Sequence, residues 1–219
     1  MPERKAPRRT RERILATALA LFNRLGEPHV TTADIADEMN ISPGNLYYHF
    51  RNKDDIIGEL YAALDADVAP LLVAPPDRPP GIEDLWFMLH LLFERMWEYR
   101  FFYRDLDEIT SRNRRIATRF AELNRRGEAT MVKLSQGLVD AETMRASESE
   151  IDALATNVMM IATYWLSWQR IVASRAAPDT GLANGRLADA AFQVMSLIAP
   201  YLEGDARALI ERLRTDYLR

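Results

Sequence analysis

The residue types best suited to recognising a partner cluster between positions 42 and 50, in the stretch SPGNLYYHF. Helical spacing places Leu46 and Phe50 on one apolar face of a short helix. The opposite face then carries side chains that donate and accept hydrogen bonds, namely Asn45, Tyr47, Tyr48 and His49. Three outward ring side chains are unusual for a plain helix surface, and they are expected of a helix that lies in a DNA groove.

Two short helices joined by a tight turn must position these side chains. The first is predicted over residues 32–39, where Thr31 is the expected N-cap and Asp34 completes a variant capping box. Asn40 tolerates the left-handed backbone that the turn requires. Ser42 then caps the second helix, residues 43–50, and Pro43 occupies its first position, where a missing N–H costs nothing. These dimensions are those of a helix-turn-helix.

Helical periodicity continues along the rest of the chain, and no stretch alternates as a strand would, so the sequence predicts an all-α fold. The expected helices cover residues 10–25, 32–39, 43–50, 53–72, 82–99, 104–112, 114–140, 147–175, 185–202 and 204–218. Proline-rich and glycine-containing segments at 73–81 and 176–185 are read as loops. We expect an N-terminal arm and helix-turn-helix domain over residues 1–52, followed by a C-terminal helical-bundle domain over residues 53–219 for ligand binding and dimerisation.

Charge is distributed unevenly along the 219 residues, whose net charge is −4. Residues 1–53 hold nine Lys or Arg and six Asp or Glu, so they carry +3 and the remainder carries −7. A basic N-terminal part on an acidic chain suits a protein that meets DNA at one end. No cysteine is present and no apolar run reaches the length of a membrane span, which favours a cytoplasmic protein with no membrane contact.

The segments VTTADIA (residues 30–36) and ISPGNLYYHFRNK (residues 41–53) resemble the DNA-binding signature of the TetR family of transcriptional regulators. The resemblance is detailed over residues 9–60, and beyond them it is architectural. Asn40 departs from the pattern, because the family most often has glycine there. The resemblance implies a homodimer that binds double-stranded operator DNA and is controlled by a small-molecule effector.

Roles for single residues follow from that resemblance together with helix-turn-helix geometry. Pro43, Gly44 and Asn45 are expected where side chains meet base edges, and Asn45 can pair with adenine. Contacts to phosphates are expected from Thr32, Tyr47, Tyr48, His49 and Lys53, and Ser42 is a further candidate for a DNA contact. Arg8 and Arg9 are expected to belong to a flexible basic arm that could enter the minor groove or touch the DNA backbone. Two alternatives stay open: the basic N-terminal run is a solvated tail, and the tyrosines are half-buried packing residues.

Large aromatic and methionine side chains gather in the C-terminal part, as expected of an apolar ligand pocket. The candidate pocket residues are Trp86, His90, Phe93, Trp97, Phe102, Phe120, Met131, Met160, Tyr164 and Trp168. The alternative for each is plain core, and for His90 and Glu94 it is a helix-surface pair. The apolar helices 147–175 and 185–202 are expected to form the dimer interface.

Together these features predict a repressor that binds a palindromic operator as a dimer and is released by a small, largely apolar ligand. The alternatives are a helical DNA-binding or interaction protein without effector control, and an activator. An enzyme is not expected, because no nucleophile, phosphate-loop, dinucleotide or Glu-x-x-His motif is present in the sequence. No cofactor and no metal site is expected either.

Overall fold

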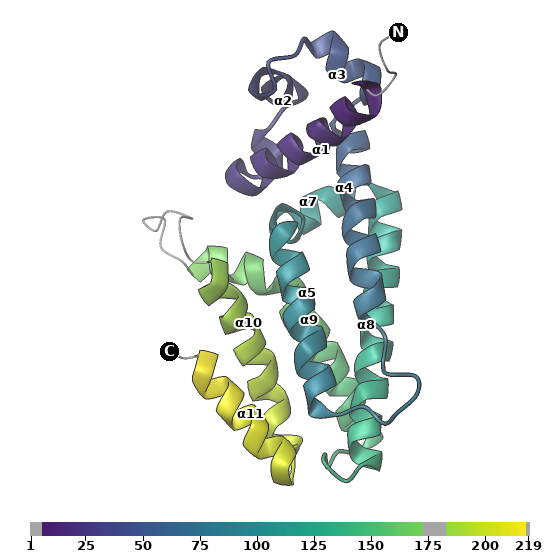
Figure 1. Cartoon of the computed structure of the whole chain (residues 1–219), viewed down its shortest axis with the longest axis vertical. Helices are drawn as coiled ribbons and strands as arrows, with labels where there is room; N and C mark the ends of the chain where they lie inside the picture. Colours follow the sequence, from purple (N-terminus) through teal and green to yellow (C-terminus); the bar gives the residue numbers. More distant parts are fainter. Residues whose placement is uncertain (1–5, 173–182, 218–219) are drawn as a thin grey trace. The chain divides into compact units, whose positions relative to one another are not determined.

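Helices form all of the regular structure in the computed structural model, which describes residues 6–172 and 183–217 (Figure 1). The only strand-like pairing within these residues is an isolated bridge between Met144 and Leu202. The predicted all-α class is therefore confirmed. The chain forms two compact units. Unit 1 ends at Ala66 and is completed by Tyr99–Thr118, and unit 2 comprises Asp67–Glu98 and the chain from Arg119 onward.

Unit 1 holds the predicted helix-turn-helix and, in addition, two helices from the middle of the chain. Its elements are α1 (Ala6–Leu25), η1 (Glu27–His29), α2 (Thr32–Glu38), α3 (Pro43–His49), most of α4 (Lys53–Val68), α6 (Arg100–Arg104), α7 (Leu106–Arg112) and the start of α8 (Arg114–Asp140). This division differs from the boundary expected between residues 52 and 53. The physical reason is apolar packing across a long sequence separation: Phe22 of α1 contacts Phe101, and Tyr61 of α4 contacts Phe102, with ring centroids 5.2 and 5.0 Å apart.

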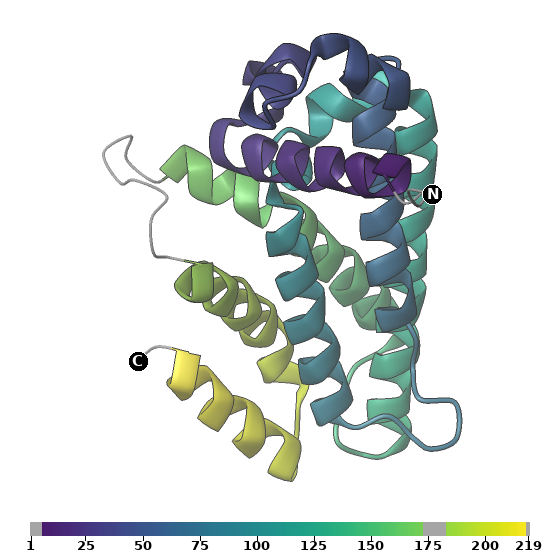
Figure 2. The ribbon, with the colours of Figure 1, turned by 45° about the horizontal axis from the view of Figure 1, so that its top comes forward.

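Helix α1 crosses α4 within unit 1 (Figure 2). Arg11 fixes the crossing, because its guanidinium pairs with Glu59 at 2.8 Å and lies 4.8 Å from the centroid of the Phe50 ring. Ile14, Ala18 and Phe22 are fully buried on the inner side of α1. Leu25, three residues after Phe22, is 49% exposed, because it stands at the helix end, where Gly26 turns the chain away with a φ of 88°.

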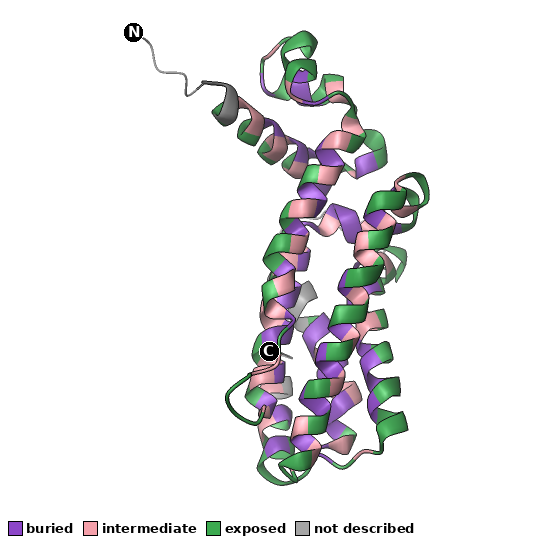
Figure 3. Cartoon of the chain, turned by 90° about the vertical axis from the view of Figure 1, so that its right-hand side faces the viewer, coloured by how far each residue is buried: buried purple, intermediate pink, exposed green. Residues whose placement is uncertain are grey.

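Unit 2 is a bundle of longer helices. It contains η2 (Ala69–Leu71), α5 (Ile82–Glu98), most of α8, α9 (Glu148–Val172), α10 (Ala183–Ile198), η3 (Ala199–Tyr201) and α11 (Gly204–Tyr217). Helix α10 packs against α5, α9 and α11. In each unit the buried residues lie on the sides of helices that face one another (Figure 3).

Helices α8 and α9 approach closely, because Gly127 of α8 has no side chain where Met159 of α9 lies. A Cβ atom at that position would be 2.6 Å from the sulfur of Met159. One turn before Gly127 the two helices are joined by a hydrogen bond of 3.2 Å from the Thr163 hydroxyl to Oδ1 of Asn124. At the far end of α8, Gly137 lies against the ring of Pro80 in the proline-rich loop.

Of the described residues, none belongs to a helix long and apolar enough to cross a membrane. The predicted loop over residues 176–185 and the end of the helix predicted to residue 175 fall mainly outside the described residues.

Candidate nucleic-acid interface

The start of α2 is fixed by a reciprocal capping box. The Thr31 hydroxyl accepts a hydrogen bond from the Asp34 backbone N–H at 3.2 Å, and the Asp34 carboxylate accepts from the Thr31 N–H at 2.8 Å and from its hydroxyl at 2.7 Å. The hydrogen bond from the Thr31 backbone N–H, and to a lesser extent the one from the Thr31 hydroxyl, holds the pKa of Asp34 below its ordinary value. The predicted cap is confirmed, and it sets where α2 begins.

The turn between α2 and α3 has the predicted backbone. Asn40 adopts a φ of 53°, in the left-handed region. Ser42 caps α3 by accepting a hydrogen bond from the Asn45 N–H at 3.2 Å, and Pro43 follows at the first helical position. Because both ends of the turn are defined in this way, the start of α3 has a fixed orientation on α2.

Helix α3 has one buried and one exposed side. Leu46 is fully buried and Phe50, at the C-cap, is 2% exposed, whereas Tyr47 and Tyr48 are 51% and 78% exposed. Pro43, Gly44 and Asn45 at its first turn are exposed as well. A Cβ at Gly44 would meet only the Ser42 hydroxyl, 4.0 Å away, so packing within the chain does not demand glycine there. The exposed side of α3 is therefore free to enter a deep groove of a partner molecule.

Two hydroxyl groups meet on this exposed side. Thr32 Oγ1 and the Tyr47 hydroxyl oxygen are 3.1 Å apart, which joins the first turn of α2 to the middle of α3. The imidazole of His49, half-buried, lies edge-on to the Tyr48 ring with centroids 5.1 Å apart. Thr32, Tyr47 and Tyr48 therefore form one polar, ring-bearing surface beside the start of α3.

Arg8 and Arg9 belong to a helix and not to a flexible arm. Helix α1 begins at Ala6, earlier than the predicted residue 10, so Arg9 stands on its first turns and is exposed. The side chain of Arg8 lies outside the described part of the chain.

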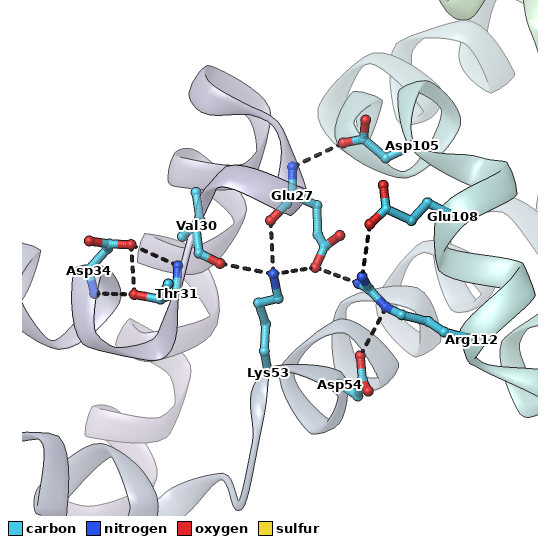
Figure 4. A network of polar contacts seen from close by, with 9 residues as sticks. All are labelled: Glu27, Val30, Thr31, Asp34, Lys53, Asp54, Asp105, Glu108 and Arg112. Carbon is cyan, nitrogen blue, oxygen red and sulfur yellow. Dashed lines mark hydrogen bonds and ion pairs between the residues drawn. The ribbon is translucent and has the colours of Figure 1, made fainter.

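Lys53 requires a correction. The sequence predicted a phosphate contact, but the Lys53 ammonium points into unit 1, where it donates to the carbonyl oxygens of Glu27 and Val30, each at 3.0 Å, and pairs with the Glu27 carboxylate at 2.8 Å (Figure 4). An ammonium group has three N–H donors, and these three partners use all of them. Asn52 is the N-cap of α4, because its Oδ1 accepts from the Asp55 N–H at 2.8 Å.

Glu27 is the centre of a polar network that sequence reasoning missed. Its side chain is fully buried, and one carboxylate oxygen, Oε1, contacts both Lys53 and Arg112 (Figure 4). Arg112, at the end of α7, also pairs with Asp54 and Glu108, each at 3.4 Å. Burial disfavours the charged guanidinium, but the hydrogen bond and the charge of Glu27, with the two further carboxylates, outweigh it and raise the pKa of Arg112.

Sequence patterns gave no sign of this network. Glu27 precedes a proline in the short connection between α1 and α2, where an acidic residue ordinarily faces solvent. Arg112 is 85 positions away along the chain. Only the helical spacing of Glu108 and Arg112 was visible as a surface pair.

The predicted pocket residues differ in burial and in the unit that holds them. Phe102 is buried in unit 1 against Tyr61, so it is removed from the pocket set. Met160, Tyr164 and Trp168 are also removed, because they are 52%, 47% and 55% exposed along one stripe of α9. A stripe at helical spacing looks the same in sequence whether it faces a core, a ligand or solvent.

The remaining candidates lie in unit 2. Phe93 and Met131 are buried, as the core alternative requires, whereas Trp86, Trp97 and Phe120 are half-buried. His90 stacks on Trp86 with ring centroids 5.4 Å apart, and its Nε2 lies 3.5 Å from the Glu94 carboxylate. The last contact is the helix-surface pair that the sequence left open.

A groove of about 1150 Å³ in unit 2 is lined by none of these candidates. It lies between the start of α5, the loop after α8 and the exposed side of α11, and its lining includes Ile82, Thr143 and Leu209. Within the described residues, no group of three or more His, Asp or Glu side chains could hold a metal ion.

Comparison with known proteins agrees with this arrangement. A family model described as "Bacterial regulatory proteins, tetR family" matches residues 14–60, and one described as "Bacterial transcriptional repressor" matches residues 64–210. A protein of Escherichia coli strain K12 described as a probable acrEF/envCD operon repressor is 38% identical over 53 residues. That match covers 24% of each protein, so the chain spans about a quarter of the length of this curated relative.

Solved structures match over nearly the whole chain. A TetR-family transcriptional regulator from Marinobacter aquaeolei VT8 is 35% identical, with a TM-score of 0.85 over 95% of this chain and 98% of that one. The SmeT–triclosan complex shares the fold, with 17% identity and a TM-score of 0.59 over 90% of this chain and 94% of that one. Because the family models together match most of the chain and one full-length structure exceeds 30% identity, this protein belongs to the TetR family of bacterial transcriptional regulators.

Proposed function

We propose that this protein represses transcription by binding a palindromic operator as a homodimer, and that a small, largely apolar ligand releases it. One observation carries the proposal: α3 buries Leu46 and Phe50 while it exposes Pro43, Gly44 and Asn45 at its first turn. In a helix-turn-helix, the residues at this turn of the second helix meet base edges in the major groove.

The exposed groups of unit 1 divide into two classes of contact. Asn45 is the candidate for reading a base, because its amide can pair with the N6 and N7 atoms of adenine. Thr32 and Tyr47, whose hydroxyls already lie together, are candidates for one phosphate, and Tyr48, His49 and Arg9 for others. Phosphate contacts fix the register of α3 in the groove without reading the sequence.

The exposed stripe of α9 supports the homodimer. Beyond Met160, Tyr164 and Trp168 it continues to Ile171 and Val172, which are 78% and 57% exposed. A contiguous apolar surface of this kind on a water-soluble regulator is expected to be covered by a partner. We assign this partner as a second copy of the chain, paired through α9 and α10. A two-fold axis would place two copies of α3 at two half-sites about 34–36 Å apart.

Release by a ligand rests on the family and on the half-buried aromatic residues of unit 2. SmeT, which shares the fold, was solved in complex with triclosan. Trp86, Trp97 and Phe120 are the candidates here for contact with such a molecule. For release, the ligand must bind the DNA-incompetent conformation more tightly, and DNA must then weaken ligand binding by the same factor.

Selection of bound sites from random double-stranded DNA tests the proposal. We expect a palindrome whose half-sites lie one helical turn apart. Asn45→Ala should cost about 1–3 kcal/mol at one base pair of each half-site and relax the preference there. Tyr47→Phe keeps the ring, removes the hydroxyl and should weaken binding to all sequences alike.

A matched control is Gln136→Ala, which removes an exposed side-chain amide from α8, outside the proposed dimer interface. Selection of unrelated sequences, with a steep dependence of affinity on salt, would favour a non-specific DNA-binding protein instead. A specific palindrome whose occupancy no apolar compound or cell extract alters would leave a regulator without effector control. Transcription from a promoter that carries the operator separates repression from activation.

A further inference from the structure

Helices α6 and α7 connect two helices of unit 2 along the chain, yet they pack inside the unit that carries α3. Residue 99 follows directly on α5, and α8 continues from residue 114 into unit 2. Within unit 1 the Phe101 backbone N–H donates to the Asn23 side-chain oxygen at 3.0 Å, and Arg104 donates to the Asn23 carbonyl oxygen at 3.1 Å. The end of α1 is therefore held by a segment that is covalently continuous with α5 and α8.

A second attachment lies four residues further along, at η1. The Glu27 backbone N–H donates to the Asp105 carboxylate at 3.0 Å, and the buried Glu27 carboxylate pairs with Arg112 (Figure 4). Both partners come from the short segment of α6 and α7. The segment of α6 and α7 therefore holds both the backbone and the side chain of Glu27.

From Glu27 the contacts lead directly to the start of α2. Lys53 joins the Glu27 carboxylate to the Val30 carbonyl oxygen, and Val30 immediately precedes Thr31, the residue that caps α2. A carboxylate taken fully out of water must be balanced by cations in good geometry. Among the described residues, removing Arg112 leaves Lys53 as the remaining cation paired with the Glu27 carboxylate, so Glu27 and the connection that follows it lose one of the contacts that fix their position.

We propose that the contact between Arg112 and Glu27 is a positioning element that sets the orientation of α2 and α3, and through it the operator half-site spacing that the dimer accepts. The inference rests on the proposed function. Neither residue is assigned a contact with DNA: Glu27 is fully buried, and Arg112 is surrounded by three carboxylates. Displacement of the segment of α6 and α7, by a ligand or otherwise, reaches the start of α2 through this pair.

The test uses the full-length dimer and the operator selected from random DNA, together with copies whose central spacer is one or two base pairs longer or shorter. We expect Arg112→Gln to weaken binding to the best operator by roughly tenfold, within the range of coupled contacts. The same variant should weaken binding to operators of altered spacing less. The ratio of the affinity for the best operator to the affinity for an altered operator therefore falls. Arg112→Lys, which keeps the charge, should restore part of that ratio.

The matched control is Arg115→Gln, which removes the same charge from an exposed position of unit 1. The slope of log affinity against log salt separates positioning from a phosphate contact, because each lost phosphate contact lowers the slope by about 1. We expect an unchanged slope for Arg112→Gln. Thermal unfolding of each variant gives the fraction folded at the assay temperature.

Three results would overturn the inference. They are an unchanged spacing ratio in Arg112→Gln, a spacing ratio altered equally in Arg115→Gln, and effects of Glu27→Gln and Arg112→Gln on operator affinity that simply add in the double variant. If Arg112→Gln does not fold, Arg112→Lys and Glu27→Gln carry the same comparison. Failure of the wild-type protein to select any palindrome would instead refute the proposed function.

Discussion

Truncation of Trp168 tests whether α9 forms the homodimer. The side chain is 55% exposed in the single chain. A tryptophan offers up to about 250 Å², so about 140 Å² remain for a partner to cover. At about 25 cal/mol per Å² this contributes about 3 kcal/mol per copy. Two-fold symmetry presents the residue twice, so Trp168→Ala should weaken the dimer by up to about 6 kcal/mol, or about ten-thousandfold in Kd.

Sedimentation equilibrium over a wide range of protein concentration measures this Kd. Phe87→Ala is the matched control, because Phe87 is 56% exposed and stands on α5, outside the proposed interface. We expect Trp168→Ala to sediment as a monomer at concentrations where the wild-type protein and Phe87→Ala are dimers. A Trp168→Ala variant that dimerises as tightly as the wild type, or dissociation caused by Phe87→Ala instead, would refute the assignment of α9.

Three further predictions concern stability and are measured by urea unfolding. Gly58→Ala in α4 should stabilise the protein by about 0.5–1 kcal/mol, because a Cβ there meets no atom within 4 Å and alanine favours the helix; a loss of stability would contradict this. Gly137→Ala in α8 should cost about 1–3 kcal/mol, since its Cβ would overlap the rigid ring of Pro80; equal stability of the Gly58→Ala and Gly137→Ala variants would show that this ring moves aside freely. Hydrogen bonds from Thr31 lower the pKa of Asp34. The ionised carboxylate therefore stabilises the fold fully at pH values above the ordinary pKa of 3.8, and this stabilisation is lost as the pH falls through the lowered pKa. The stability difference between wild type and Asp34→Asn should therefore shrink on acidification, and a difference that stays constant would rule out the capping contribution.

Local features of the fold could be predicted from the sequence because local chemistry determines them. The range of α8 agrees with its prediction at both ends, and α2 and α3 each begin at the predicted residue. At those starts, caps such as Thr31 and Ser42 act over three residues. Where local signals were weak the prediction was less accurate, as at α6, most of which falls between the helices predicted over residues 82–99 and 104–112.

The candidate site was predictable only in part, for the same reason. The exposure of Tyr47 and Tyr48 follows from the spacing of Leu46 and Phe50 within one helix. The inward direction of Lys53 does not, because its partners lie on a connection more than 20 residues earlier. Periodicity also cannot distinguish an exposed stripe from a buried one, and for that reason the sequence predicts a pocket position for Trp168, which is exposed.

The way α6 and α7 complete unit 1 limits how the chain can be divided. A fragment that stops at Ala66 would leave the Phe22 ring without Phe101 and the Tyr61 ring without Phe102, and would strip the Glu27 carboxylate of its arginine. Such a fragment is therefore not an autonomous folding module. A chimeric regulator that takes its DNA specificity from a relative should therefore include that relative's residues 99–118 along with its N-terminal helices. Otherwise the contacts between these two segments have to be redesigned.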